Sequence, residues 1–123
     1  MSAFDIKKAK KNLQKRVCRQ EKELDSRFQN AQSDFKKISE FIIKKYKPEK
    51  LFQWGSLLDR SKFSLNSDID IGLEGILDPA LYFELLRVTD SMTRFSLHIV
   101  QMEKIEPEYA DSIKKYGKLI YEA

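Results

Sequence analysis

The sequence predicts a mixed α/β domain, with a small mixed β-sheet packed against helices and a long helix at the N-terminal end. Two observations predict this class. Residues 1–47 contain neither Gly nor Pro and carry apolar side chains at helical spacing. After them, short apolar runs alternate with helical segments in the order α-β-α-β-α-β-α. We therefore expect the helix to occupy residues 1–47 and the α/β domain to occupy residues 48–123.

The N-terminal helix has one continuous apolar stripe. Two sets of apolar residues, each with a period of seven, interleave at spacings of three and four: Val17, Leu24, Ala31 and Ile38 with Phe28, Phe35 and Ile42. A helix of ~40 residues is ~60 Å long, which exceeds the expected width of the domain. We expect residues 24–46 to pack on the domain and the first twenty to project. The projecting end would contact a second copy or another partner, or it would fray.

Three strands and one extended tail are expected after Lys47-Pro48, which ends the helix because a residue before proline avoids the helical region. The strands are 51–54, 68–73 and 95–102, and the tail is 119–121.

Three further helices are expected between these strands. A short one follows Gly55-Ser56 at 57–60. A second runs from Pro79 to about residue 90, with Asp78 as its N-cap. The last begins at Pro107 and ends before Gly117.

The candidate site combines a Gly-Ser turn with two aspartates on one strand. Gly55 and Ser56 follow a strand and offer backbone amides, a hydroxyl and the start of a short helix, which together favour an anion. Asp68 and Asp70 are two positions apart, so both carboxylates lie on the same face of the strand. Carboxylates suit Mg²⁺, which also binds substrate phosphates. A turn with a half-exposed strand is the alternative interpretation.

The pattern resembles a known family. Residues 51–56 followed by 67–71 are similar to the Gly-Ser and Asp-x-Asp motifs of the DNA polymerase β-like nucleotidyltransferase superfamily. The likeness is greatest to its minimal, MNT-type branch, and residues 105–121 are similar to the C-terminal helix and tail of that branch. The resemblance implies a nucleotidyltransferase palm-like fold.

The resemblance also implies roles for individual residues. Gly55 and Ser56 would hold the triphosphate of ATP, while Asp68 and Asp70 would bind Mg²⁺ or Mn²⁺ and act in catalysis. Ser67 and Arg60 are further candidates for nucleotide binding. Lys62 either reaches a phosphate or is simply exposed to solvent, and Trp54 either stacks on a base or packs in the core.

One position departs from the family pattern. The family has a third carboxylate on the next strand, and the aligned residue here is His98. A histidine suits Mn²⁺ or Zn²⁺ better than Mg²⁺, and it can also act as a general base. We include His98 among the catalytic candidates. Glu103 is a poor substitute because strand parity places it on the face opposite His98.

Two functions follow from these residues. The first is transfer of a nucleoside monophosphate, AMP from ATP, to a hydroxyl of a protein or small molecule. In the MNT-type branch such proteins pair with HEPN-domain toxins as antitoxins, so the resemblance implies a HEPN-type partner. The alternative is a weakened or inactive transferase fold that serves as an interaction protein, because His98 replaces the third carboxylate.

Composition argues against several other classes of protein: nucleic-acid-binding, zinc-binding, disulfide-bonded, membrane-spanning and secreted proteins. Residues 1–50 carry 15 Lys and Arg against 7 Asp and Glu, whereas residues 51–123 carry 8 against 12. The basic segment permits nucleic-acid binding but offers few aromatic side chains for stacking, so this function ranks last. Cys18 is the only cysteine, which leaves no Cys/His zinc cluster and no internal disulfide. The sequence shows neither a membrane span nor a signal peptide, and we expect a cytoplasmic protein.

Overall fold

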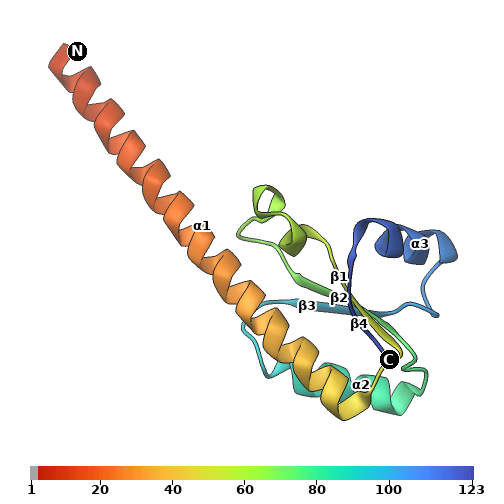
Figure 1. Ribbon diagram of the computed structural model, residues 1–123. Helices are drawn as coiled ribbons and strands as arrows, with labels where there is room; N and C mark the ends of the chain where they lie inside the picture. Colours follow the sequence, from red (N-terminus) through yellow and green to blue (C-terminus); the bar gives the residue numbers. More distant parts are fainter. Residues whose placement is uncertain (1–2) are drawn as a thin grey trace.

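The computed structural model describes residues 3–123 and has the expected fold class (Figure 1). A long helix is followed by an α/β domain with a four-stranded sheet. The elements in chain order are α1 (Ala3–Tyr46), β1 (Lys50–Trp54), the 3₁₀ turns η1 (Ser56–Leu58) and η2 (Arg60–Lys62), β2 (Ile69–Glu74), α2 (Pro79–Asp90), β3 (Leu97–Gln101), α3 (Pro107–Tyr116) and β4 (Lys118–Glu122).

The sheet is mixed, with the strand order β3-β2-β1-β4. Strand β1 pairs antiparallel with both β2 and β4, and β2 pairs parallel with β3. The segment expected as an extended tail is therefore a hydrogen-bonded edge strand. Its partner β1 supplies the unpaired backbone groups that a fourth strand needs, a pairing between distant segments that local sequence does not encode.

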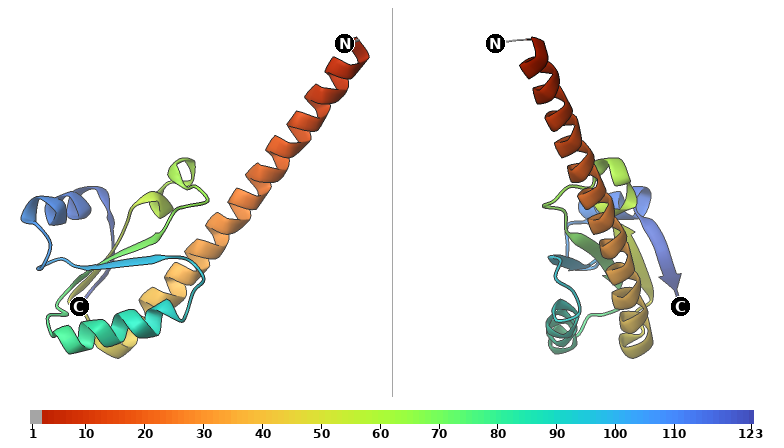
Figure 2. Two further views of the ribbon diagram at one scale, coloured as in Figure 1. Left: turned by 180° about the vertical axis from the view of Figure 1, so that it is seen from behind. Right: turned by 90° about the vertical axis from the view of Figure 1, so that its left-hand side faces the viewer.

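Helices cover both faces of the sheet, so the structure has two cores. Helices α1 and α2 pack on one face and α3 packs on the other (Figures 1 and 2). The strand residues of the first core are Leu51, Ile69, Ile71, Leu73 and Ile99. The second core contains Phe52, Val100, Met102, Ala110 and Ile113. Alternate residues of β2 face opposite sides, so Asp70 lies on the α3 face, opposite to Ile69 and Ile71.

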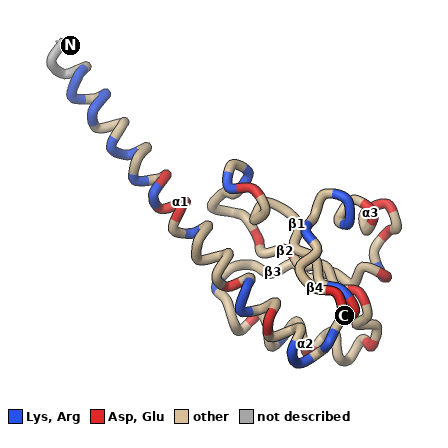
Figure 3. Tube along the Cα trace, in the orientation of Figure 1, with Lys and Arg blue, Asp and Glu red and all other residues tan. Residues whose placement is uncertain are grey.

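Helix α1 is in contact with the domain only along its C-terminal half. Every side chain from residue 6 to residue 23 is exposed, whereas Ala31, Ile38 and Ile42 are fully buried. Figure 2 shows the N-terminal half projecting away from the sheet. Between residues 6 and 20 this half carries seven Lys and Arg and no Asp or Glu, which appears in Figure 3 as blue segments along its length.

The short helix expected at 57–60 is wrong. Two separate 3₁₀ turns, η1 and η2, occupy this segment, and each has three residues. Asp59 separates them in an extended conformation, and its side chain accepts a hydrogen bond from the Ser61 amide. The break removes the helix dipole that the sequence argument placed at Ser56, because a single turn aligns few peptide dipoles.

The other two expected helices are present. Asp78 caps α2 by accepting from the Ala80 amide at 3.0 Å, and Pro79 occupies the first turn. Helix α3 begins at Pro107 and is followed by Gly117. None of the helices in residues 3–123 combines the length and apolar character that a bilayer crossing requires.

Candidate functional site

The Gly-Ser turn and the aspartate strand meet in direct contact at Gly55 and Asp70. Strand β1 runs antiparallel to β2, and Trp54 lies opposite Asp70 in the register. The next residue, Gly55, has a φ of 84°, a conformation that side-chain-bearing residues rarely adopt. A Cβ at Gly55 would collide with the Oδ2 atom of Asp70. Position 55 therefore requires glycine for two reasons: the backbone has a positive φ, and the carboxylate of Asp70 fills the space that a Cβ would need.

His98 lies beside Asp70 because β2 and β3 are parallel and pair these two residues. The Nδ1 atom of His98 is 3.4 Å from the Oδ1 atom of Asp70. The two groups differ in exposure: the His98 side chain is 53% exposed and that of Asp70 is 12% exposed. The structure thus brings together two of the three residues that we expected to be catalytic.

Burial raises the pKa of Asp70 from its ordinary value of 3.8 to about 6. The neighbouring His98 opposes this shift, and the charge of Asp68 adds to it. A buried carboxylate close to a second one is costly to ionise unless a cation joins them. The Asp70 carboxylate therefore has the electrostatic character of a site that gains from a bound cation.

Asp68 precedes β2, where its side chain is exposed. In residues 3–123 no three carboxylate, imidazole or thiol side chains converge as a ready-made metal cluster. The donors nevertheless fit a divalent cation of the kind that takes a few protein ligands together with substrate phosphates: two carboxylates, one of them buried, with an imidazole alongside. Asp68 and Asp70 would hold such an ion.

The three remaining candidates differ in their surroundings. Ser56 begins η1 directly after Gly55, at the edge of the site. Ser67 accepts a hydrogen bond from the Ser64 amide at 2.8 Å, so its hydroxyl organises the loop before β2. Arg60 donates from Nε to Asp25 of α1 at 2.5 Å and does not line the neighbouring pocket.

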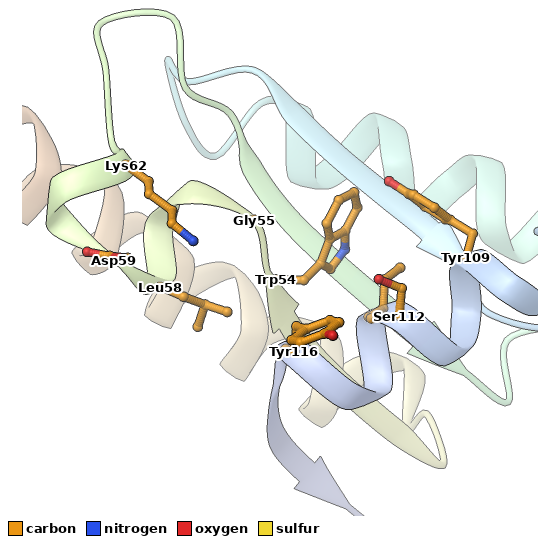
Figure 4. A pocket seen from close by; sticks show the side chains of 10 residues that line it. Trp54, Gly55, Leu58, Asp59, Lys62, Tyr109, Ser112 and Tyr116 are labelled. Atoms are coloured by element: carbon orange, nitrogen blue, oxygen red, sulfur yellow. The ribbon is translucent and has the colours of Figure 1, made fainter.

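That pocket, of about 320 Å³, opens beside the Gly-Ser turn (Figure 4). Gly55, Leu58, Asp59 and Lys62 line it from the turn, and Trp54 and α3 line the other side. The α3 residues are Tyr109, Ser112, Ile113 and Tyr116. Sequence reasoning missed the two tyrosines. Their spacing of seven residues on a helix was the only available signal, and it does not reveal which element the helix faces.

Glu103, considered as a replacement for the third carboxylate, is bound elsewhere. Its Oε2 atom accepts from the Gly75 amide at 2.8 Å, at the far end of β2 from Asp70. His98 remains the residue beside Asp70.

Neither a protein-family model nor a curated protein matches the chain, but two solved structures share its fold. One is the crystal structure of the toxin–antitoxin MntA-HepT, with a TM-score of 0.57 and 20% identity over 75% of this chain and 73% of that chain. The other is a mutant of that complex in which two aspartates, two positions apart, are replaced by glutamate; its TM-score is 0.58 and its identity 20%, over 72% of this chain and 73% of that chain. The expected mixed α/β fold is confirmed, and these two structures share it.

Proposed function

We propose that this protein is a metal-dependent nucleotidyltransferase that moves AMP from ATP to a hydroxyl of a protein or small molecule. The contact between Gly55 and Asp70 carries the proposal, because it joins the Gly-Ser turn and the Asp-x-Asp strand in one site. The same fold occurs in a complex for which a mutant with two aspartates at the same i, i+2 spacing has been crystallised. Asp68 and Asp70 have the same i, i+2 spacing in this chain.

Each residue of the site has a role in this proposal. The Gly55 backbone and the Ser56 hydroxyl bind the triphosphate, because a glycine permits a phosphate to approach the main chain closely. Asp68 and Asp70 hold a divalent ion, Mg²⁺ or Mn²⁺. When bound, this ion offsets the charge of the triphosphate and polarises its α-phosphoryl group. Lys62 replaces Arg60 as the phosphate-binding cation, since it lines the pocket and Arg60 is paired with Asp25.

His98 supplies the general base. The acceptor oxygen attacks the α-phosphorus, the bond from that phosphorus to the bridging oxygen of the β-phosphate breaks, and pyrophosphate leaves. The Nε2 atom of His98 takes the hydroxyl proton, while Nδ1 faces the carboxylate of Asp70. A carboxylate beside the other nitrogen orients the imidazole and stabilises its protonated form.

The partner in this proposal is a HEPN-type toxin that the protein neutralises as an antitoxin. The MNT-type resemblance suggests this partner, and the structures that share the fold are toxin–antitoxin complexes. A hydroxyl side chain of the toxin is then the acceptor of AMP.

The experiment uses ATP labelled on its α-phosphate, Mg²⁺ or Mn²⁺, and the protein encoded by the neighbouring gene. We expect label on that protein, none after Asp70→Asn or Asp68→Asn, and full labelling with Asp111→Asn, an exposed aspartate on α3. Labelling that survives both site substitutions would refute the proposal.

A second candidate function is partner binding without catalysis, which the replacement of a carboxylate by His98 favours. It predicts no labelling, with toxin neutralisation unchanged by Asp68→Asn and Asp70→Asn. Deleting residues 1–20 would then abolish neutralisation, because the exposed half of α1 would form the interface.

A further inference from the structure

The pocket beside the Gly-Ser turn is lined by three aromatic side chains: Trp54, Tyr109 and Tyr116 (Figure 4). The two tyrosines are seven residues apart, so they lie on one face of α3. They are unusually accessible for large aromatic residues, with exposed fractions of 44% for Tyr109 and 72% for Tyr116. Exposed aromatic groups gathered around a pocket are typical of a site that takes a flat ligand.

Trp54 connects this pocket to the candidate catalytic groups. Its ring centroid is 5.3 Å from that of His98 and 5.6 Å from that of Tyr109. Within residues 3–123 the Nε1 atom of Trp54 is buried and has no hydrogen-bond acceptor. Buried donors in proteins are nearly always satisfied, so this one would gain from an acceptor on a bound ligand.

The charged side chains of the pocket lie on the side of the turn. The carboxylate of Asp59 already accepts two hydrogen bonds, one from the amide and one from the hydroxyl of Ser61. Lys62 forms no salt bridge within the described part of the chain, and Figure 4 shows its ammonium group on the side toward Gly55. The pocket thus has a cation on the side of the Gly-Ser turn and two tyrosines on the wall formed by α3, so its two sides suit the phosphate end and the base end of a nucleotide.

We infer that the aromatic pocket holds the nucleobase of the donor nucleotide, with Tyr116 and Tyr109 as its stacking and positioning residues. This inference rests on the proposed function for the place of the triphosphate. The pocket volume of about 320 Å³ lies at the lower end of the range for small-molecule sites. The aromatic side chains at its wall supply stacking without reading the hydrogen-bonding edge of a base.

The single tryptophan makes the inference directly measurable. Trp54 is the only tryptophan in the sequence, so its fluorescence reports on this pocket alone. The titrants are AMP, ribose 5-phosphate and inorganic tripolyphosphate, each with a chelator present to exclude metal ions. We expect saturable quenching by AMP and none by the two ligands that lack a base.

Substitutions test which residues hold the base. Tyr116→Ala should weaken AMP binding about tenfold, and Tyr116→Phe should retain it, because stacking depends on the ring. Phe83→Ala is the matched control: Phe83 is an aromatic residue on α2 with 67% exposure, outside the pocket. Far-ultraviolet circular dichroism checks that each variant is folded.

The outcomes separate this inference from the proposed function. Quenching by AMP that depends on Tyr116, in a protein that transfers no AMP, would support the base pocket and refute the transferase. The absence of AMP quenching, or equal quenching in Tyr116→Ala, would overturn the inference whatever the transfer assay gives. Quenching by N-acetyltyrosinamide but not by AMP would also overturn it, because the pocket would then take the acceptor.

Discussion

At the scale of single residues, the site depends on how closely Gly55 and Asp70 approach each other. The carboxylate of Asp70 occupies the space in which any other residue at position 55 would carry its Cβ. Because the two residues come from different motifs, their contact fixes the Gly-Ser turn relative to the strand that carries Asp70. Substitutions at either residue should therefore affect both the stability and the function of the protein.

Gly55→Ala should destabilise the fold by about 2 kcal/mol or more, because it combines a strained positive φ with a collision against Asp70. Urea unfolding measures the change. Ser56→Ala is the control, since it removes only a hydroxyl next to the same turn, and we expect a loss below about 0.5 kcal/mol. Equal stability of Gly55→Ala and the wild type would contradict the described contact.

Asp70→Asn should stabilise the metal-free protein at neutral pH. The folded-state pKa of Asp70, about 6, lies above the ordinary value of 3.8, so the folded state binds more protons between these values. The free energy of unfolding therefore falls as the pH rises through this range, by at most about 3 kcal/mol from this group.

Urea unfolding in a chelator at pH 4 and pH 7.5 tests this sign. We expect Asp70→Asn to be more stable than the wild type at pH 7.5 and similar to it at pH 4. A variant that is less stable than the wild type at pH 7.5 would show that Asp70 stabilises the metal-free fold.

At the scale of elements, the residues at the start of α2 were a sufficient signal for that helix. Asp78 followed by Pro79 predicted the start of α2, and the structure shows the expected cap. Asp78→Ala should cost about 1 kcal/mol of stability, whereas Asp78→Asn should remain within a few tenths of the wild type. Thermal unfolding of the two variants gives the comparison, and equal losses would mean that the cap hydrogen bond contributes nothing.

Elements that form by pairing with a segment far away in the sequence could not be predicted from their own residues. The segment at 118–122 became β4 because β1 had a free edge, and its side-chain pattern alone indicated only an extended tail. The short helix expected after Gly55 was wrong for a local reason instead: Asp59 is extended and its side chain accepts a hydrogen bond from the Ser61 amide, which separates two 3₁₀ turns. Strand alternation correctly placed Ile69 and Ile71 in the core, opposite to the aspartates.

Some residues of the candidate site could be predicted from local sequence, and others could not. Gly55, Ser56, Asp68 and Asp70 could be selected from spacing and residue type, and the parallel pairing of β2 with β3 then brought His98 to Asp70. The aromatic pocket could not be selected, because it requires α3 to lie beside the Gly-Ser turn. The sequence of residues 107–116 alone predicts only a helix that carries two tyrosines.

At the scale of the whole molecule, the protein consists of a packed domain, which includes the C-terminal half of α1, and an exposed basic arm formed by the N-terminal half of α1. The burial of α1 begins at Leu24 and Phe28, and Phe28 packs edge-on against Phe63 at 5.3 Å. The seven cations between residues 6 and 20 would repel each other across a pair of identical arms. This charge is a reason to expect a partner with an acidic surface at the arm, while contact with a second copy stays a prediction.

Removal of residues 1–20 should leave the domain as stable as the full chain, because every described side chain among residues 6–20 is exposed. The urea midpoint measures this, and Phe28→Ala, which should cost roughly 1–3 kcal/mol, is the positive control. A truncated chain as unstable as the Phe28→Ala variant would place part of the folded core in the arm.

In the proposed function, the Gly-Ser turn and the aspartate strand form one metal-dependent nucleotide site. Calorimetric titration of ATP into the full chain, with and without Mn²⁺, measures whether such a site exists. We predict saturable binding that strengthens at least about tenfold when Mn²⁺ is present, and that loses this gain in Asp70→Asn, since Asp68 and Asp70 would hold the ion that offsets the phosphate charge. Binding of equal strength with and without Mn²⁺, unchanged in Asp70→Asn, would show that the aspartates hold no metal ion for the nucleotide.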